Sequence, residues 1–108
     1  MFDFNEKVVN RVRKIAEIKQ LLDNGQFKGV VDISLQSKKN VSMSTTRIIN
    51  PKIRSAEVGA ELMDRRNRAM IGYKNIDEIT SRTYYDGSES YYIVYADGLV
   101  MSVTFKQQ

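Results

Sequence analysis

The sequence predicts an α+β domain in which one mainly antiparallel sheet has two helices packed on one face. Three observations predict this fold. Apolar residues recur at three- and four-residue steps over 4–24 and 55–71, which is the period of an amphipathic helix. The segments between and after these stretches alternate apolar and polar residues, as half-buried strands do. The 108 residues are enough for a single domain, 1–108, with one modest core.

The first helix is expected over residues 4–24. Asp3 and Glu6 have the spacing of a capping box, and Gly25 suits the left-handed position that follows a helix. Lys19 falls within the apolar face, where a charged side chain is out of place. The apolar face itself consists of Val8, Val9, Val12, Ile15, Ala16 and Leu22.

Two strands are expected between the helices and three after them. Asn50-Pro51 ends the second strand, and Asp97-Gly98 is a strong signal for a two-residue hairpin turn. Both faces of residues 91–95 are apolar or aromatic, which indicates a central strand. The expected strands are 27–36, about 41–49, 76–85, 90–96 and 99–105. The element order is therefore α-β-β-α-β-β-β.

The second helix is expected over residues 55–71. Ser55 is a suitable N-cap, and Gly72 follows the last turn. On a helical wheel Arg66 falls inside the apolar stripe around Leu62. This position indicates a helix face that meets a partner or an acidic group; an arginine that snorkels along the edge of the stripe is the alternative.

The residue types that most often carry catalysis are missing. Without histidine and cysteine the chain has no Ser-His-Asp or Cys-His nucleophile and no zinc site of the usual kind. It also has no P-loop or dinucleotide fingerprint. Glu57, Glu61 and Asp64 would lie close together on the second helix, but the pairs Glu61–Arg65 and Asp64–Arg68 explain them better than Mg²⁺ does. We therefore expect no metal, no cofactor and no enzymatic activity. Histidine-free cleavage of RNA, as in some small bacterial toxins, is a remote alternative.

Positive charge is concentrated in one part of the chain. The net charge is +4, and residues 26–54 contain six basic residues against Asp32 alone. Lysine and arginine neutralise phosphates, and nearby hydroxyl side chains can hydrogen-bond to them. Lysines that protect an edge hairpin from aggregation are the alternative. The predicted binding residues for nucleic acid or a partner are Lys38, Lys39, Arg47, Lys52, Arg54, Arg65, Arg66 and Arg68. No aromatic residue interleaves the basic hairpin, which argues against a stacking platform for single strands there.

Most of the six tyrosines flank the turn at residues 86–89. Cross-strand aromatic pairs stabilise hairpins, so packing is one explanation for them. The other is a protein interface formed by Tyr84, Tyr85 and Tyr92 next to Asp86 and Glu89.

The composition also bears on location and partners. No apolar run approaches the ~20 residues needed to cross a bilayer, and the N-terminus lacks the pattern of a signal peptide. We expect a cytoplasmic protein of a bacterium or its phage. The leading hypothesis is a small protein that binds nucleic acid or another acidic surface. One alternative is an inhibitor of phage or mobile-element type that blocks a host protein such as a defence nuclease. A second is a structural, oligomer-forming component, and a homodimer is compatible with any of the three.

Overall fold

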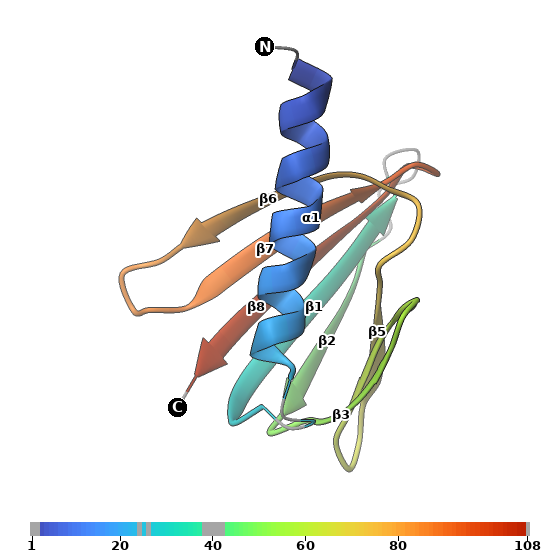
Figure 1. The fold of residues 1–108 in the computed structure, drawn as a ribbon. Coiled ribbons are helices and arrows are strands. Elements are labelled where there is room, and N and C mark those ends of the chain that lie inside the picture. The colour runs from blue at the N-terminus through green and yellow to red at the C-terminus, as the bar shows by residue number, and fades with distance from the viewer. Residues whose placement is uncertain (1–2, 24, 26, 38–42, 108) are drawn as a thin grey trace.

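The computed structural model of the protein describes residues 3–23, 25, 27–37 and 43–107. Over these residues the chain forms one helix and eight strands in two antiparallel sheets (Figure 1). The elements are α1 (Asp3–Leu21), β1 (Gly29–Ser37), β2 (Met43–Ile49), β3 (Lys52–Ala56), β4 (Gly59–Met63), β5 (Arg68–Gly72), β6 (Ile76–Thr83), β7 (Glu89–Tyr95) and β8 (Leu99–Gln107). The prediction of two helices packed on a single sheet is therefore wrong, because the protein is mostly β.

The larger sheet has five strands in the order β2-β1-β8-β7-β6. The first strand of the chain pairs with the last, and Val31 lies opposite Phe105 and Ile33 opposite Val103. Strand β7 has a neighbour on each side, in keeping with its two apolar or aromatic faces. Its turn to β8 contains Gly98 at φ 93°, a left-handed conformation that glycine adopts without steric cost.

The smaller sheet, in the order β3-β4-β5, replaces the predicted second helix. Leu62 on β4 lies directly opposite Ala69 on β5. These two residues are seven positions apart in the sequence, which is about two helical turns. Apolar residues that pair across a short hairpin therefore have the same sequence separation as residues on one face of a helix. The true alternation has a period of two: Ala60 and Leu62 are fully buried, while Glu61 between them is partly exposed.

The predicted helical ion pairs are wrong for the same reason. Glu61 forms its ion pair with Arg68 on the neighbouring strand, at 3.5 Å between the side-chain Oε2 and Nε atoms. Arg66 does not lie in an apolar stripe; it is exposed in the turn between β4 and β5. The apolar helix stripe in which Arg66 was predicted to lie therefore does not exist in the structure.

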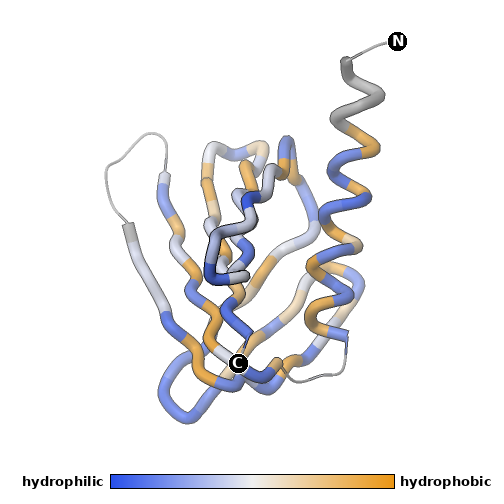
Figure 2. The backbone as a smooth tube through the Cα atoms, turned by 90° about the vertical axis from the view of Figure 1, so that its left-hand side faces the viewer, coloured by the Kyte–Doolittle hydropathy of each residue, from blue (hydrophilic) through white to orange (hydrophobic). Residues whose placement is uncertain are grey.

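One core is formed by residues of α1 and of both sheets. Helix α1 lies on one face of the larger sheet (Figures 1 and 2). Only part of its predicted apolar face is covered: Leu22 is fully buried, whereas Val9 and Val12 are 60% and 65% exposed. Ile18, which the predicted face did not include, is fully buried as well. The N-terminal part of α1 extends beyond the sheets (Figure 1). The helix face that packs contains Arg11, Ile15, Ile18 and Leu22, at three- and four-residue steps, and Val9 and Val12 are rotated away from it. Among the described residues no helix combines the length and hydropathy that crossing a membrane requires.

Two predictions can be placed only in part. Gly25 has φ 68°, as its expected position after the helix requires, although α1 ends at Leu21 rather than at residue 24. The capping-box side chains of Asp3 and Glu6 and the basic turn residues Lys38 and Lys39 lie outside what the structure describes.

Candidate nucleic-acid interface

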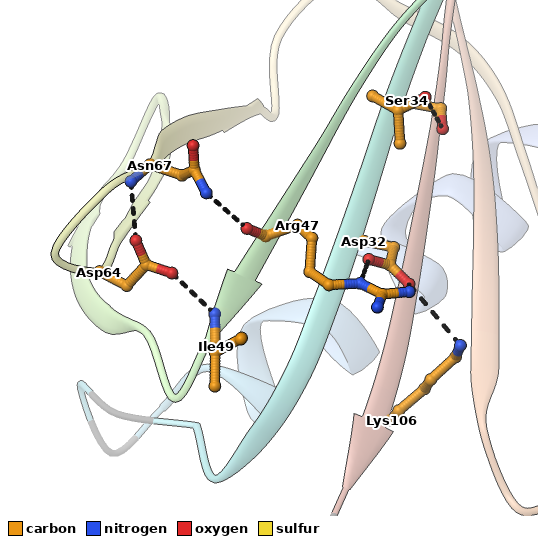
Figure 3. Close-up of polar contacts among 8 residues, drawn as sticks. Asp32, Ser34, Arg47, Ile49, Asp64, Asn67 and Lys106 are labelled. Atoms are coloured by element: carbon orange, nitrogen blue, oxygen red, sulfur yellow. Dashed lines mark hydrogen bonds and ion pairs between the residues drawn. The ribbon is translucent and has the colours of Figure 1, made fainter.

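The turn between β4 and β5 is held against the edge of the larger sheet by Asp64. Its Oδ1 atom accepts hydrogen bonds from the backbone N–H groups of Arg66 at 2.8 Å and Asn67 at 2.7 Å. Its Oδ2 atom accepts one from the N–H of Ile49 on β2 at 2.9 Å, and the Asn67 side chain donates to the Arg47 carbonyl at 2.9 Å (Figure 3). These hydrogen bonds from the backbone hold the pKa of Asp64 below its usual range, and the bond from Ile49 has the largest effect.

A hollow of about 670 Å³ lies between this turn and the end of β2. Three basic residues line it, Lys52, Arg65 and Arg66, together with the apolar side chains of Ile49 and Met63. Ile49 is 53% exposed, which is unusual for an isoleucine. The remaining lining residues are Asn50 and Asp64. We call this feature the basic hollow.

The outward face of the smaller sheet adds further positive charge next to the hollow. Alternation along β3 places Lys52 and Arg54 on the same face, and both are exposed. Arg68 lies across β4 from Lys52, since both pair with Met63. Within the described part of the chain, Arg68 is paired with Glu61, whereas Lys52, Arg54, Arg65 and Arg66 have no carboxylate within 4.0 Å. The structure therefore brings together five of the eight predicted binding residues: Lys52, Arg54, Arg65, Arg66 and Arg68.

Arg47 lies on the outer face of the larger sheet, the face turned away from α1 (Figure 3). Its guanidinium donates to both oxygens of Asp32 on β1, at 2.8 and 3.3 Å, and this hydrogen bond raises the pKa of Arg47. Lys106 on β8 approaches the same carboxylate at 3.7 Å. One carboxylate thus faces two cations, which leaves this part of the outer face positive.

Hydroxyl side chains continue along the same outer face, and most of them come from strands that sequence reasoning did not connect. The backbone register puts five residues in one row across the sheet: Thr45, Ser34, Ser102, Tyr92 and Thr80. The next row contains a second hydroxyl pair, Ser90 and Thr104, whose oxygens are 2.7 Å apart. Alternation along each strand was visible in the sequence, but the row exists only because β8 and β7 follow β1 in the sheet.

The tyrosines divide between the core and the surface. Tyr91 is buried, and its hydroxyl donates to Glu89 at 3.2 Å; burial in the core raises the pKa of Tyr91. Tyr84 and Tyr92, by contrast, are 37% and 36% exposed, with hydroxyl oxygens 3.2 Å apart. This mutual hydrogen bond lowers the pKa of Tyr84 and raises that of Tyr92. Tyr85 is fully exposed at the tip of the β6–β7 hairpin.

The structure also shows where Lys19 and the three carboxylates of the predicted second helix lie. The Lys19 ammonium lies 5.1 Å from the centroid of the Tyr73 ring in a cation–π contact, and Lys19 is exposed rather than part of a buried apolar face. Glu57, Glu61 and Asp64 do not share a helix face, because Glu61 lies on β4 and the other two lie in the turns before and after this strand. Among the described residues, no three acidic side chains gather into a group that could hold a metal ion.

Comparisons of the chain with protein-family models, curated proteins and solved structures gave no significant match.

Proposed function

We propose that this protein binds nucleic acid through the basic hollow and the adjoining face of the smaller sheet, and that it acts by binding rather than by catalysis. The observation that carries the proposal is the convergence of Lys52, Arg65 and Arg66 on one hollow, with their charges unpaired within the described part of the chain. A cytoplasmic location belongs to the same proposal, since a chain without cysteine suits a reducing compartment.

The composition of the hollow suits a nucleotide better than a simple anion. Guanidinium and ammonium groups at its edge can neutralise phosphates, and arginine can bind a phosphate through two parallel hydrogen bonds. Ile49 and Met63 offer apolar contact to a sugar or a base. Asp64 also lines the hollow, and its carboxylate accepts three backbone N–H groups, whose dipoles offset part of its negative charge.

A titration of fluorescently labelled DNA and RNA oligonucleotides at low salt tests the proposal. We expect the double variant Arg65→Ala/Arg66→Ala to weaken binding by about tenfold or more, because hydrogen bonds to charged groups contribute about 1.5–3 kcal/mol each. The matched control is Arg13→Ala/Lys74→Ala, which removes the same charge from exposed positions on α1 and after β5. A wild-type protein that retains no oligonucleotide at low salt would show the proposal to be wrong.

A protein partner is the second candidate, and Tyr85 is the observation that favours it. The hairpin that presents this fully exposed side chain is fixed by hydrogen bonds from the Tyr84 N–H to the Ser88 carbonyl and from Ser88 to Asp86. A rigidly presented tyrosine is a common anchor of protein interfaces, as an inhibitor of a host protein would need. A protein that remains bound in a nuclease-treated lysate and is lost with Tyr85→Ala, but not with Arg65→Ala/Arg66→Ala, would favour this function.

A further inference from the structure

We infer that the outer face of the larger sheet is a platform for single-stranded nucleic acid, which runs from the basic hollow across β2, β1 and β8 to Tyr92 on β7. This inference rests on the proposed function and names the form of nucleic acid that the site takes. The ligand is an unpaired strand, and three features of the surface favour it: its continuity, its chemistry and an exposed aromatic residue.

The hollow and the outer face form one continuous surface. Ile49 lines the hollow, and Arg47 and Thr45 follow it at two-residue steps on the same face of β2. From Thr45 the register leads through Ser34 and Ser102 to Tyr92, one residue on each strand. Since neighbouring strands lie about 4.8 Å apart, this path from β2 to β7 is about 14 Å long.

The chemistry along the path matches a sugar-phosphate backbone. Hydroxyl groups of serine and threonine donate and accept hydrogen bonds, and Ser34 and Ser102 are both only partly buried. Arg47 and Lys106 lie beside the path and outnumber the single carboxylate of Asp32 between them. Arg82 on β6 supplies a further cation near its far end, 5.3 Å from the centre of the Tyr84 ring.

Tyr92 is the feature that points to an unpaired strand. Tyr92 is 36% exposed on the outer sheet face, and its hydroxyl is held 3.2 Å from that of Tyr84. An aromatic ring on such a face can stack with a base only when that base is free of its own stacked neighbours, as in a single strand. The hairpin of β1 and β2 has no aromatic residue of its own; the sheet order supplies one from a strand more than forty residues further along the chain.

The test compares a labelled single strand of about 16 nucleotides with the duplex of the same sequence. We expect Tyr92→Ala to lower single-strand affinity about tenfold and to change duplex affinity less than about twofold, whereas Tyr92→Phe, which keeps the ring, retains both. Arg65→Ala/Arg66→Ala should weaken both probes. Thermal melts of each variant check that the outer-face substitutions leave the fold intact.

A second pair of variants covers the case in which Tyr92→Ala does not fold. Ser102→Glu places a carboxylate in the middle of the path, whereas Ser81→Glu places the same charge on an exposed position of β6 outside the hydroxyl row. We expect only Ser102→Glu to weaken single-strand binding. If folded Tyr92→Ala and Ser102→Glu bind the single strand as the wild type does, the inference is wrong, and the proposed function still stands if Arg65→Ala/Arg66→Ala loses affinity. A wild type that binds neither probe overturns both.

Discussion

The carboxylate of Asp64 accepts a 2.9 Å hydrogen bond from the backbone N–H of Ile49, and this bond joins the smaller sheet to the edge of the larger one. The same side chain closes the β4–β5 turn through the N–H groups of Arg66 and Asn67. An acidic residue therefore fixes the turn from which Arg65 and Arg66 line the hollow. It also occupies a backbone donor on the outer edge of β2, the Ile49 N–H, that an exposed edge strand would otherwise present to other chains.

The first prediction concerns nucleic-acid binding by Asp64→Ala. This substitution removes a negative charge next to Arg65 and Arg66, so electrostatics alone would tighten binding. We expect several-fold weaker binding instead, because three N–H groups lose their acceptor and the turn loses its fixed position. Titration of the same labelled oligonucleotides measures the effect, and tighter binding by the variant would contradict a positioning role for Asp64.

The second prediction concerns the pH dependence of stability. The pKa of Asp64 is lower in the folded protein than in the unfolded chain, so its contribution to stability is fully present above about pH 4 and is lost as the pH falls from there through the folded-state pKa. Asp86, whose pKa is also lowered, through its hydrogen bonds with Ser88, acts in the same direction. Urea unfolding near pH 7 and near pH 3 should show a smaller loss of stability for Asp64→Asn than for the wild type. Parallel losses would contradict the prediction.

The third prediction tests which face of α1 meets the core. Ile18→Ala should cost about 2–5 kcal/mol of unfolding free energy, because Ile18 is completely buried and its removal leaves a cavity. Val12→Ala should change it by less than about 0.5 kcal/mol, since Val12 is 65% exposed and alanine favours a helix more than valine does. Equal losses in chemical denaturation would mean that the apolar face expected from the sequence is the one that packs.

The fourth prediction concerns two glycines that lie opposite each other on β4 and β5. A Cβ atom on Gly59 would lie 2.5 Å from the Ile71 carbonyl oxygen, so Gly59→Ala should destabilise the protein by about 1–3 kcal/mol. A Cβ atom on Gly72 would have the Tyr95 hydroxyl, at 3.8 Å, as its nearest neighbour. We therefore expect Gly72→Ala to be neutral or stabilising by up to about 1 kcal/mol. Melting temperatures that rank the two variants the other way would contradict the β4–β5 pairing.

Much of the larger sheet was predictable because its signals are local. Period-two alternation placed β1 within two residues at its start and one at its end, and Asp97-Gly98 marked the β7–β8 turn. The second helix could not be told from a hairpin, since the opposed pair Leu62 and Ala69 has the separation of two helical turns. Distinguishing the two would have required knowing that β4 and β5 pair with each other.

The candidate site was predictable only in fragments. The run from Arg65 to Arg68 is dense in charge, and Lys52 and Arg54 were visible at the exit of the first hairpin. Their convergence depends on Asp64 and Asn67 bonding to β2, which no local pattern encodes. For Tyr92 the sequence left cross-strand packing and a protein interface as alternatives, and its place in a row with Ser102 and Ser34 follows from the strand order and register.

The salt dependence of nucleic-acid affinity is the most direct test of the proposed interface. For duplex DNA the logarithm of the binding constant falls with the logarithm of salt concentration by about 0.9 per phosphate contact. We expect Arg65→Ala/Arg66→Ala to make this slope less steep by about two, and Arg13→Ala/Lys74→Ala to leave it as in the wild type. Slopes that are the same for both double variants would contradict the interface, because net charge rather than the basic hollow would then account for binding.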